Sequence, residues 1–419
     1  MPKFEPGPKL NRRPLSALFV ADAISLTGNA VAQLAIPWYV LITTGSPVLT
    51  GLAVFFNFLP AVLAGLFGGV IVDRLGFRRT SVIADIASAA AVAAIPLLDS
   101  TVGIELWQLM ALVFLGALLD APGATARAAI LPDLATAASV PMERASGIRG
   151  SVQKGSQLIG GPLGGLLVAA LGAPTALWVN AVSFLFSAAL VAWAVPPTPS
   201  RRQEATSFRS DLVEGWRFVR QHRLILAIVL TVLITNFLDA PFSVAMPVLA
   251  NEAYGGAAEL GLMYGTYGGM ALLGSLLFSA YGHRLPRRPI LLGGYLAVPA
   301  LYLVLASLPP LPAALITLAL VGFATGGLNP VIYTVAYEKV PPALRGRVFG
   351  TMRAGAWAAI PAGVLLGGVV VQALGVVTTF LIIGLCYLAV VLYGFFNPAF
   401  RQLEKPSEPV EQPGIPDPF

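Results

Sequence analysis

Twelve apolar stretches of about 20 residues or more recur along the chain, separated by short polar or glycine-containing segments. A helix of about 20 apolar residues crosses the hydrocarbon core of a bilayer. Only 11% of the residues are charged, against about 25% in soluble globular proteins. The sequence therefore predicts an all-α polytopic membrane protein, with spans at about 16–43, 48–72, 79–98, 104–126, 148–171, 175–195, 224–250, 259–280, 289–308, 312–336, 348–373 and 376–396.

The 26 lysines and arginines fall on one set of alternating segments or in the helix ends that adjoin them. The loops between the other helix ends contain no basic residue. Because cytoplasmic loops of membrane proteins are enriched in basic residues, we expect both termini to be cytoplasmic in a bacterial inner membrane. This distribution explains the net charge of +6 without a nucleic-acid partner. The basic set includes both termini and the segments near 73–79, 127–147, 196–222, 281–288 and 338–347.

The two halves of the chain resemble each other. AIP at 35–37 matches AMP at 245–247, an offset of 210 residues, and GGLLVAALG at 164–172 matches GGVVVQALG at 367–375. Internal repeats are common in secondary transporters, whose sites lie between the repeats near the bilayer midplane. We therefore expect an N-terminal six-helix bundle (1–195), a cytoplasmic connector (196–222), a C-terminal six-helix bundle (223–396) and a mobile cytoplasmic tail (397–419).

The connector contains a predicted amphipathic helix over 207–221. Its apolar residues are expected near one helical face, with arginines as polar neighbours. Such a helix lies on the inner membrane surface, where arginine can meet anionic lipid, or it packs on the protein's own loops. The sequence leaves both possibilities open. The apolar residues are Phe208, Leu212, Val213, Trp216 and Val219.

Residues 69–79, GVIVDRLGFRR, have the form GxxxDRxGxRR and follow the second predicted span. A degenerate copy, GHRLPRR at 282–288, follows the eighth. The pattern resembles the loop motif between helices 2 and 3 of the major facilitator superfamily. DAPGATARAAILPDL (120–134), VPPALRGRVFG (340–350) and EGWRFVRQH (214–222) resemble the branch that contains macrolide efflux and enterobactin exporters. The resemblance implies twelve helices in two pseudo-symmetric six-helix bundles.

In that superfamily the charged loop is thought to latch the cytoplasmic side while the transporter faces outward. The resemblance implies this role for Gly69, Asp73, Arg74, Gly76 and Arg78, with Asp120 as an acidic partner. Glycine suits the tight turn, and the aspartate suits the N-terminus of the next helix. Arg79 is expected only to maintain topology.

Two other features match drug antiporters less well. GPLGG at 161–165 is a partial match to their GPxxGG motif. Many of them carry an arginine in the middle of helix 4, whereas Arg127 is expected at the inner end of the fourth span. The resemblance therefore does not settle how transport is coupled.

Ionisable groups at bilayer depth cost at least about 2.5–3.5 kcal/mol on insertion scales, so each should have a partner or a function. Asp239 lies near the middle of the seventh span and matches Asn29 at an offset of 210. We expect it to exchange a proton or bind a cationic substrate; a structural hydrogen bond is the alternative. Asp22 is a second coupling candidate, and Asp85 is expected to pair with a basic loop residue or Lys154. Other polar or aromatic candidates are Gln33, Asn236, Tyr264, Tyr267, Asn329, Tyr333 and Trp357.

The chain contains no Walker phosphate loop and no GxGxxG, HExxH, GxSxG or CxxC pattern. No enzyme activity, cofactor or metal site is predicted, and an ATP-driven pump is disfavoured. We predict a monomeric secondary active transporter that exports a small amphipathic or drug-like molecule in exchange for protons by alternating access. Uptake of a small solute, export of a siderophore or metabolite, and a non-transporting receptor on the same scaffold are the alternatives.

Overall fold

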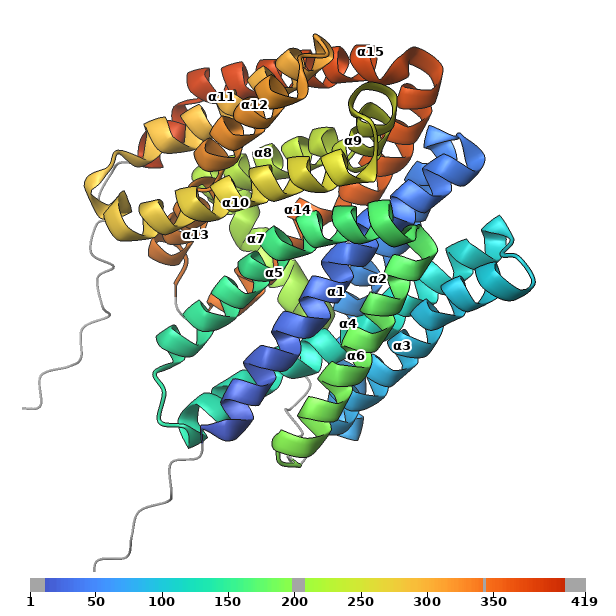
Figure 1. Ribbon diagram of the computed structural model, residues 1–419. Coiled ribbons are helices and arrows are strands. Elements are labelled where there is room, and N and C mark those ends of the chain that lie inside the picture. Colours follow the sequence, from blue (N-terminus) through green and yellow to red (C-terminus); the bar gives the residue numbers. More distant parts are fainter. Residues whose placement is uncertain (1–11, 198–207, 342–343, 404–419) are drawn as a thin grey trace, which may run out of the picture.

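The computed structural model describes residues 12–197, 208–341 and 344–403, and these residues form helices and no strands (Figure 1). Most side chains of the inner half of the second helix, 61–74, lie outside this description. The N-terminal half contains α1 (Arg13–Thr44), α2 (Pro47–Leu75), α3 (Phe77–Thr101), α4 (Leu106–Ala137), α5 (Met142–Leu171) and α6 (Ala173–Ala194).

The connector helix α7 (Phe208–Gln221) leads into the C-terminal half. That half contains α8 (Arg223–Asp239), α9 (Phe242–Leu249), η1 (Ala250–Tyr254), α10 (Ala257–Tyr281), η2 (Gly282–Arg284), α11 (Arg287–Ala306), α12 (Leu311–Thr325), α13 (Leu328–Lys339), α14 (Arg345–Ala358), α15 (Ile360–Phe396) and η4 (Pro398–Leu403).

These elements make the twelve predicted crossings. The seventh crossing combines α8, α9 and η1 and is interrupted next to Pro241, and the tenth combines α12 and α13. Gly375 has φ 76° and divides α15 into the end of the eleventh crossing and the whole of the twelfth. Nine helical segments of the described chain are long and apolar enough to cross a membrane; one of them, 347–396, contains two crossings.

Three tight corners use glycine in the same conformation. Gly76, Gly172 and Gly375 have φ values of 80°, 82° and 76°, and each joins two successive crossings. A side chain at such a φ is strained, which explains the requirement for glycine. Gly172 and Gly375 end the repeated segments of the two halves, so the duplication seen in the sequence is reproduced in the backbone.

The two bundles contact each other through a pair of equivalent glycine contacts. A Cβ atom at Gly165 of α5 would lie 2.6 Å from the Cα of Gly261 of α10. A Cβ at Gly51 of α2 would lie 3.3 Å from the Cα of Gly368 of α15. Gly261 follows Gly51 by 210 residues and Gly368 follows Gly165 by 203. The same contact therefore occurs twice, with the halves exchanged.

We name the side of the molecule that carries α7 the connector side, and the opposite side the far side. The bundles meet towards the far side, where Ser46 donates a hydrogen bond to Gln372 of the other bundle (2.7 Å). On the connector half of α5, a Cβ at Gly147, Gly150 or Gly155 would meet nothing within 4 Å. The described contacts thus close the far side and leave space on the connector side.

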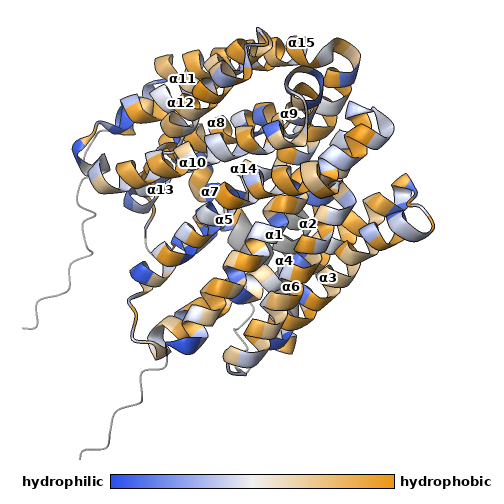
Figure 2. Ribbon diagram, viewed as in Figure 1, coloured by the Kyte–Doolittle hydropathy of each residue, from blue (hydrophilic) through white to orange (hydrophobic). Residues whose placement is uncertain are grey.

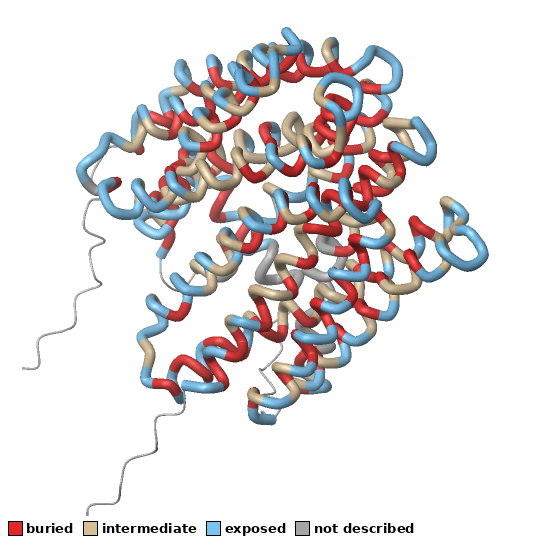
Figure 3. Tube along the Cα trace, viewed as in Figure 1, coloured by how far each residue is buried: buried red, intermediate tan, exposed pale blue. Residues whose placement is uncertain are grey.

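The outer surface suits a lipid environment. Apolar residues dominate the visible outer faces of the crossings (Figure 2), while buried residues lie along the faces that meet neighbouring helices (Figure 3). Large aromatic side chains are exposed near helix ends: Trp107 is 69% exposed, Trp193 82% and Phe396 81%. Aromatic residues are enriched at this level in membrane proteins.

Two predicted segment ends differ from the structure. The fourth crossing was expected to end near 126, but α4 continues to Ala137, because the segment after Arg127 supplies buried apolar residues. The tail was expected to be mobile from 397, but η4 buries Phe400 (2% exposed) and Leu403 (1%) beside α8 and α11. Residues 404–419 lie outside the described chain.

Candidate functional site

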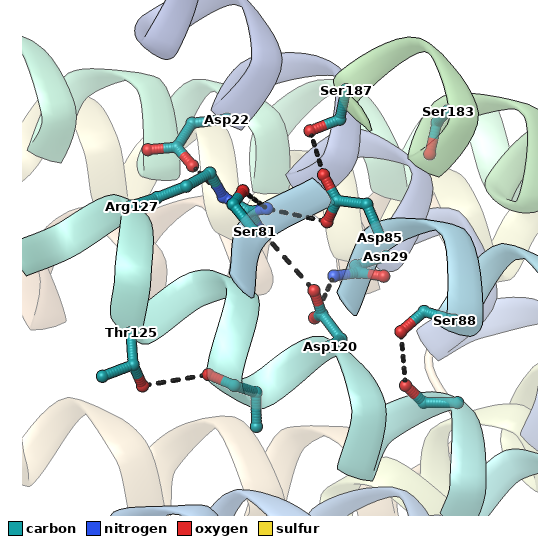
Figure 4. A network of polar contacts seen from close by, with 12 residues as sticks. Asp22, Asn29, Ser81, Asp85, Ser88, Asp120, Thr125, Arg127, Ser183 and Ser187 are labelled. Carbon is teal, nitrogen blue, oxygen red and sulfur yellow. Dashed lines mark hydrogen bonds and ion pairs between the residues drawn. The ribbon is translucent and has the colours of Figure 1, made fainter. Parts of the chain in front are cut away.

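Arg127 of α4 lies at the centre of a buried group of charges in the N-terminal bundle (Figure 4). Its Nε lies 2.7 Å from Asp22 Oδ1 of α1, and its Nη1 lies 2.7 Å from Asp85 Oδ1 of α3. Its Nη2 lies 3.6 Å from Asp120 Oδ1 on the same helix. The guanidinium has donors in a planar fork, so it can face several carboxylates at once. We call these four residues and Arg149 the arginine cluster.

Each carboxylate of the cluster has a second partner. Asp22 pairs with Arg149 of α5 (3.3 Å), Asp85 accepts a hydrogen bond from Ser187 of α6 (2.7 Å), and Asp120 accepts one from Asn29 of α1 (3.0 Å). Buried ion pairs need such additional hydrogen bonds to offset the loss of hydration. Three carboxylates face two guanidinium groups, so the fully ionised cluster carries one net negative charge.

The exposure of the cluster is uneven. The side chains of Arg127 and Asp85 are 2% and 0% exposed, whereas those of Asp120 and Arg149 are 20% and 31% exposed. Asp120 also makes the longest ion-pair contact of the three carboxylates with Arg127. The cluster is therefore buried and closely paired at its centre, and it is partly exposed at Asp120 and Arg149.

Asp239 forms a different site in the C-terminal bundle. It is the last residue of α8, before the break at Pro241, whose missing N–H interrupts the helical hydrogen bonds. Tyr302 of α11 donates a hydrogen bond to its Oδ1 (2.8 Å), and Tyr387 of α15 donates one to its Oδ2 (3.4 Å). No described lysine or arginine lies within 4 Å of this half-buried carboxyl. We call Asp239, Tyr302 and Tyr387 the aspartate–tyrosine site.

Aromatic rings surround one side of this site. The ring of Phe242 lies 6.0 Å from that of Tyr302, 6.2 Å from that of Tyr264 and 6.4 Å from that of Tyr267. The Tyr267 hydroxyl lies 3.2 Å from Thr325 Oγ1. Aromatic faces attract cations, so a carboxyl among them is suited to a cationic or amphipathic ligand.

The chain matches a family described as "Transmembrane secretion effector" over residues 8–417. It belongs to this family of major facilitator superfamily transporters. The multidrug efflux pump Tap of Mycolicibacterium fortuitum is 33% identical over 407 residues, covering 95% of this chain and 99% of that protein. Macrolide efflux protein A of Streptococcus pyogenes is 24% identical over 376 residues, covering 88% and 91%.

The fold is also that of solved major facilitator transporters. The nucleoside transporter NupG superposes with a TM-score of 0.72 at 13% sequence identity, over 94% of this chain and 99% of that one. At that identity the likeness concerns the fold alone. The predicted fold class, twelve helices in two six-helix bundles, is confirmed.

The position of Arg127 and the partners of Asp120 and Asp85 differ from those expected from the sequence. We expected this residue at the inner end of the fourth span, but it lies inside α4, ten residues before the helix ends at Ala137. Asp120 was expected to meet the arginines of the charged loop, and Asp85 a loop residue or Lys154. Among the described side chains, both acids instead meet Arg127, and Lys154 is exposed. The sequence did contain a signal for the pairing of Asp120 with Arg127. The two residues are seven positions apart, which places them two turns apart on one face of a helix.

The charged loop is described only in part. Gly76 makes the corner between α2 and α3. Arg78 donates a hydrogen bond to the carbonyl of Ala192 on α6, so its described contact stays inside the N-terminal bundle and involves no acid. The side chains of Asp73 and Arg74, and the surroundings of Gly69, lie outside the described residues. The latch remains a prediction.

The other predicted residues divide into two groups. Tyr264 and Tyr267 lie beside the aspartate–tyrosine site, and Asn236 donates a hydrogen bond to the carbonyl of Ala356, which links α8 to α14 (2.6 Å). The second group is exposed and has no described contact with Asp239; it consists of Gln33, Asn329, Tyr333 and Trp357. Trp357 instead lies under the guanidinium of Arg353, 4.9 Å from its ring centre.

Four residues of these sites were missed by sequence reasoning: Arg127, Arg149, Tyr302 and Tyr387. The tyrosines lie in spans that are apolar on all sides, where nothing local marks them as partners of a carboxyl. No group of three His, Cys, Asp or Glu in the described parts of the chain is arranged to hold a metal ion.

Proposed function

We propose that this transporter exports small amphipathic, drug-like molecules in exchange for protons. Two relatives named for drug or macrolide efflux, which align with most of the chain, support the substrate class and the direction. The concentration of basic residues on the connector side supports cytoplasmic termini in a bacterial inner membrane. The protein acts as a monomer and as a transporter rather than an enzyme.

Alternating access is the proposed mechanism. The bundles 1–195 and 223–396 move against each other around the connector 196–222. Glycine contacts and the Ser46–Gln372 hydrogen bond close the far side, while the connector half of α5 faces open space. This arrangement supports our proposal of a state open to the cytoplasm, from which a substrate enters before export.

The observation that carries the coupling proposal is the neutral surrounding of Asp239. Each carboxylate of the arginine cluster has a guanidinium within 4 Å, so its protonation would take an ion-pair partner away from a buried cation. Among the described residues, the side chains that donate to Asp239 are tyrosines, so it can take up a proton without leaving a buried cation unpaired. A proton and a cationic substrate then compete for one carboxyl, and their exclusive binding gives exchange.

Asp22 receives a different role in this proposal. It lies between Arg127 and Arg149 and thereby connects α1 with α4 and α5. We assign it to holding these helices together rather than to proton exchange.

Purified protein in liposomes tests the coupling. Ethidium and a radiolabelled macrolide serve as probes, with a pH-sensitive dye trapped inside to follow protons. Asp239→Asn is expected to abolish gradient-driven movement of both probes and the proton flux that accompanies it. Probe exchange without a gradient should continue with weaker binding, because the aromatic rings beside position 239 remain while the carboxylate that faces the cation is lost.

Asp99→Asn is the matched control. Asp99 also accepts a hydrogen bond from a tyrosine, Tyr39, but it lies at the far-side end of α3. This variant should keep gradient-driven transport. If Asp239→Asn transports at the wild-type rate under a gradient, the proposed coupling site is wrong.

A further inference from the structure

The connector helix α7 has one face fixed against the C-terminal bundle. A Cβ at Gly215 would lie 2.3 Å from Thr351 Oγ1 and 2.5 Å from the carbonyl oxygen of Arg347, both on α14. Phe218 is 8% exposed and Val219 is fully buried. This close packing sets the rotation of α7 about its own axis, so the opposite face is a defined surface.

That opposite face differs from the predicted apolar face. Val219 was expected beside Val213 and Trp216, but it points into the protein, whereas Val213 is 50% and Trp216 44% exposed. Arg217 and Arg220, which are also exposed, follow the exposed apolar pair along the same face of the helix. Residues three and four apart lie on one side of a helix, so the four side chains form a mixed apolar and basic stripe.

The stripe lines a hollow on the molecular surface. Among the described residues, Val213, Trp216, Arg217, Arg220 and Gln221 of α7 form one wall of an open depression of about 410 Å³. Arg217 and Arg220 have no acidic partner among the described residues. Their charges are therefore available to an anion that enters the hollow.

We propose that this hollow binds the headgroup of an anionic phospholipid of the surrounding membrane. The two guanidinium groups match a phosphate, and Trp216 and Val213 match the glycerol and upper acyl region, where tryptophan is favoured. Only His222 separates α7 from α8, the start of a membrane crossing, so the stripe ends at the bilayer boundary. A free phosphate compound would contact the two arginines but would not contact Val213 and Trp216.

Native mass spectrometry of the whole protein with added phosphatidylglycerol or phosphatidylcholine tests this site. Each basic residue near an anionic surface contributes about 1 kcal/mol, so the double variant Arg217→Gln/Arg220→Gln should bind phosphatidylglycerol about 30-fold more weakly. The double variant Arg79→Gln/Arg401→Gln is the matched control. It removes the same charge from two exposed positions outside the hollow and should bind normally.

Two further measurements separate the possible ligands. Trp216→Ala should weaken phosphatidylglycerol binding while leaving binding of glycerol phosphate unchanged, because only the lipid contacts the apolar pair. Equal binding of both phospholipids, equal loss in the matched control, or glycerol phosphate binding as tight as that of phosphatidylglycerol would overturn the proposal. The lipid measurement needs no transport, so its outcome is independent of the proposed coupling at Asp239.

Discussion

The arginine cluster and the aspartate–tyrosine site lie in halves of the chain that repeat each other, yet they treat buried acids in opposite ways. Asn29 of α1 and Asp239 of α8 are equivalent in the repeat. In the N-terminal half, Asn29 is neutral and donates a hydrogen bond to Asp120, which forms an ion pair with Arg127. In the C-terminal half, Asp239 is itself the acid, and its hydrogen-bond donors Tyr302 and Tyr387 are neutral.

The difference shows how a duplicated scaffold can separate two tasks. A carboxylate that is paired with arginine neutralises a buried cation and connects helices. A carboxyl that is held by hydroxyl groups can change its charge state without unpairing a neighbour. The first arrangement is suited to stability and the second to exchange, although glycine corners and bundle contacts are shared by both halves.

Removal of the central arginine is expected to have the largest effect. Arg127→Gln leaves three carboxylates with Arg149 alone, and breaking a buried ion pair costs about 3–5 kcal/mol. The thermal unfolding midpoint in detergent should fall sharply. Arg127→Lys keeps the charge without the planar fork, so its stability should be intermediate. An Arg127→Gln variant as stable as the wild type would contradict the structural role of the cluster.

Two matched substitutions compare how much a carboxylate of each site contributes to stability. Asp85→Asn removes one of the two 2.7 Å ion pairs of the buried Arg127 and should reduce the free energy of unfolding by about 3 kcal/mol. Asp239→Asn removes no ion pair, and its amide oxygen can still accept from Tyr302, so the loss should be below about 1 kcal/mol. Chemical unfolding followed by circular dichroism measures both. Equal losses would mean that the two acids are not differently paired.

The tyrosines of the aspartate–tyrosine site should differ in importance. Tyr302 donates at 2.8 Å and Tyr387 at 3.4 Å, and the shorter hydrogen bond orients the carboxyl more strongly. Gradient-driven ethidium transport should fall about tenfold in Tyr302→Phe, the loss of about 1.5 kcal/mol expected for a hydrogen bond to a charged group. Tyr387→Phe should lose less than about threefold. The reverse order would show that Tyr387 is the residue that positions the carboxyl.

The smallest effect is expected at the contact between the two halves. Gln372 Oε1 accepts hydrogen bonds from the Ser46 hydroxyl (2.7 Å) and the Val48 N–H (3.2 Å) at the start of α2. Gln372→Ala should shift the population towards far-side opening about fivefold, the effect of one hydrogen bond of about 1 kcal/mol. Spin-label distances across the far side measure this shift.

Gln372→Glu provides the control for that experiment. Its carboxylate can accept both hydrogen bonds and is favoured at a helix N-terminus. Far-side closure should therefore be retained. If both variants open equally, closure does not depend on an acceptor at this position.

Much of the architecture could be predicted from the sequence. The lengths of the apolar stretches determine the twelve crossings, and the basic residues indicate their orientation. The repeats predicted the equivalent halves and paired Asn29 with Asp239 before their surroundings were known. These features depend on depth in the bilayer and on order along the chain, which a linear sequence records.

The partners of the buried acids were decided only by the tertiary structure. Arg127 meets acids from α1 and α3 that are 105 and 42 residues away in sequence, and Asp239 meets tyrosines from two crossings. The same holds for α7, where packing around Gly215 selected the buried face. In a helix that is apolar on every side, hydropathy gives the depth of a residue but not its direction about the helix axis. That direction depends on how the helices pack, and it determines which acids are paired with arginine and which are left with neutral donors.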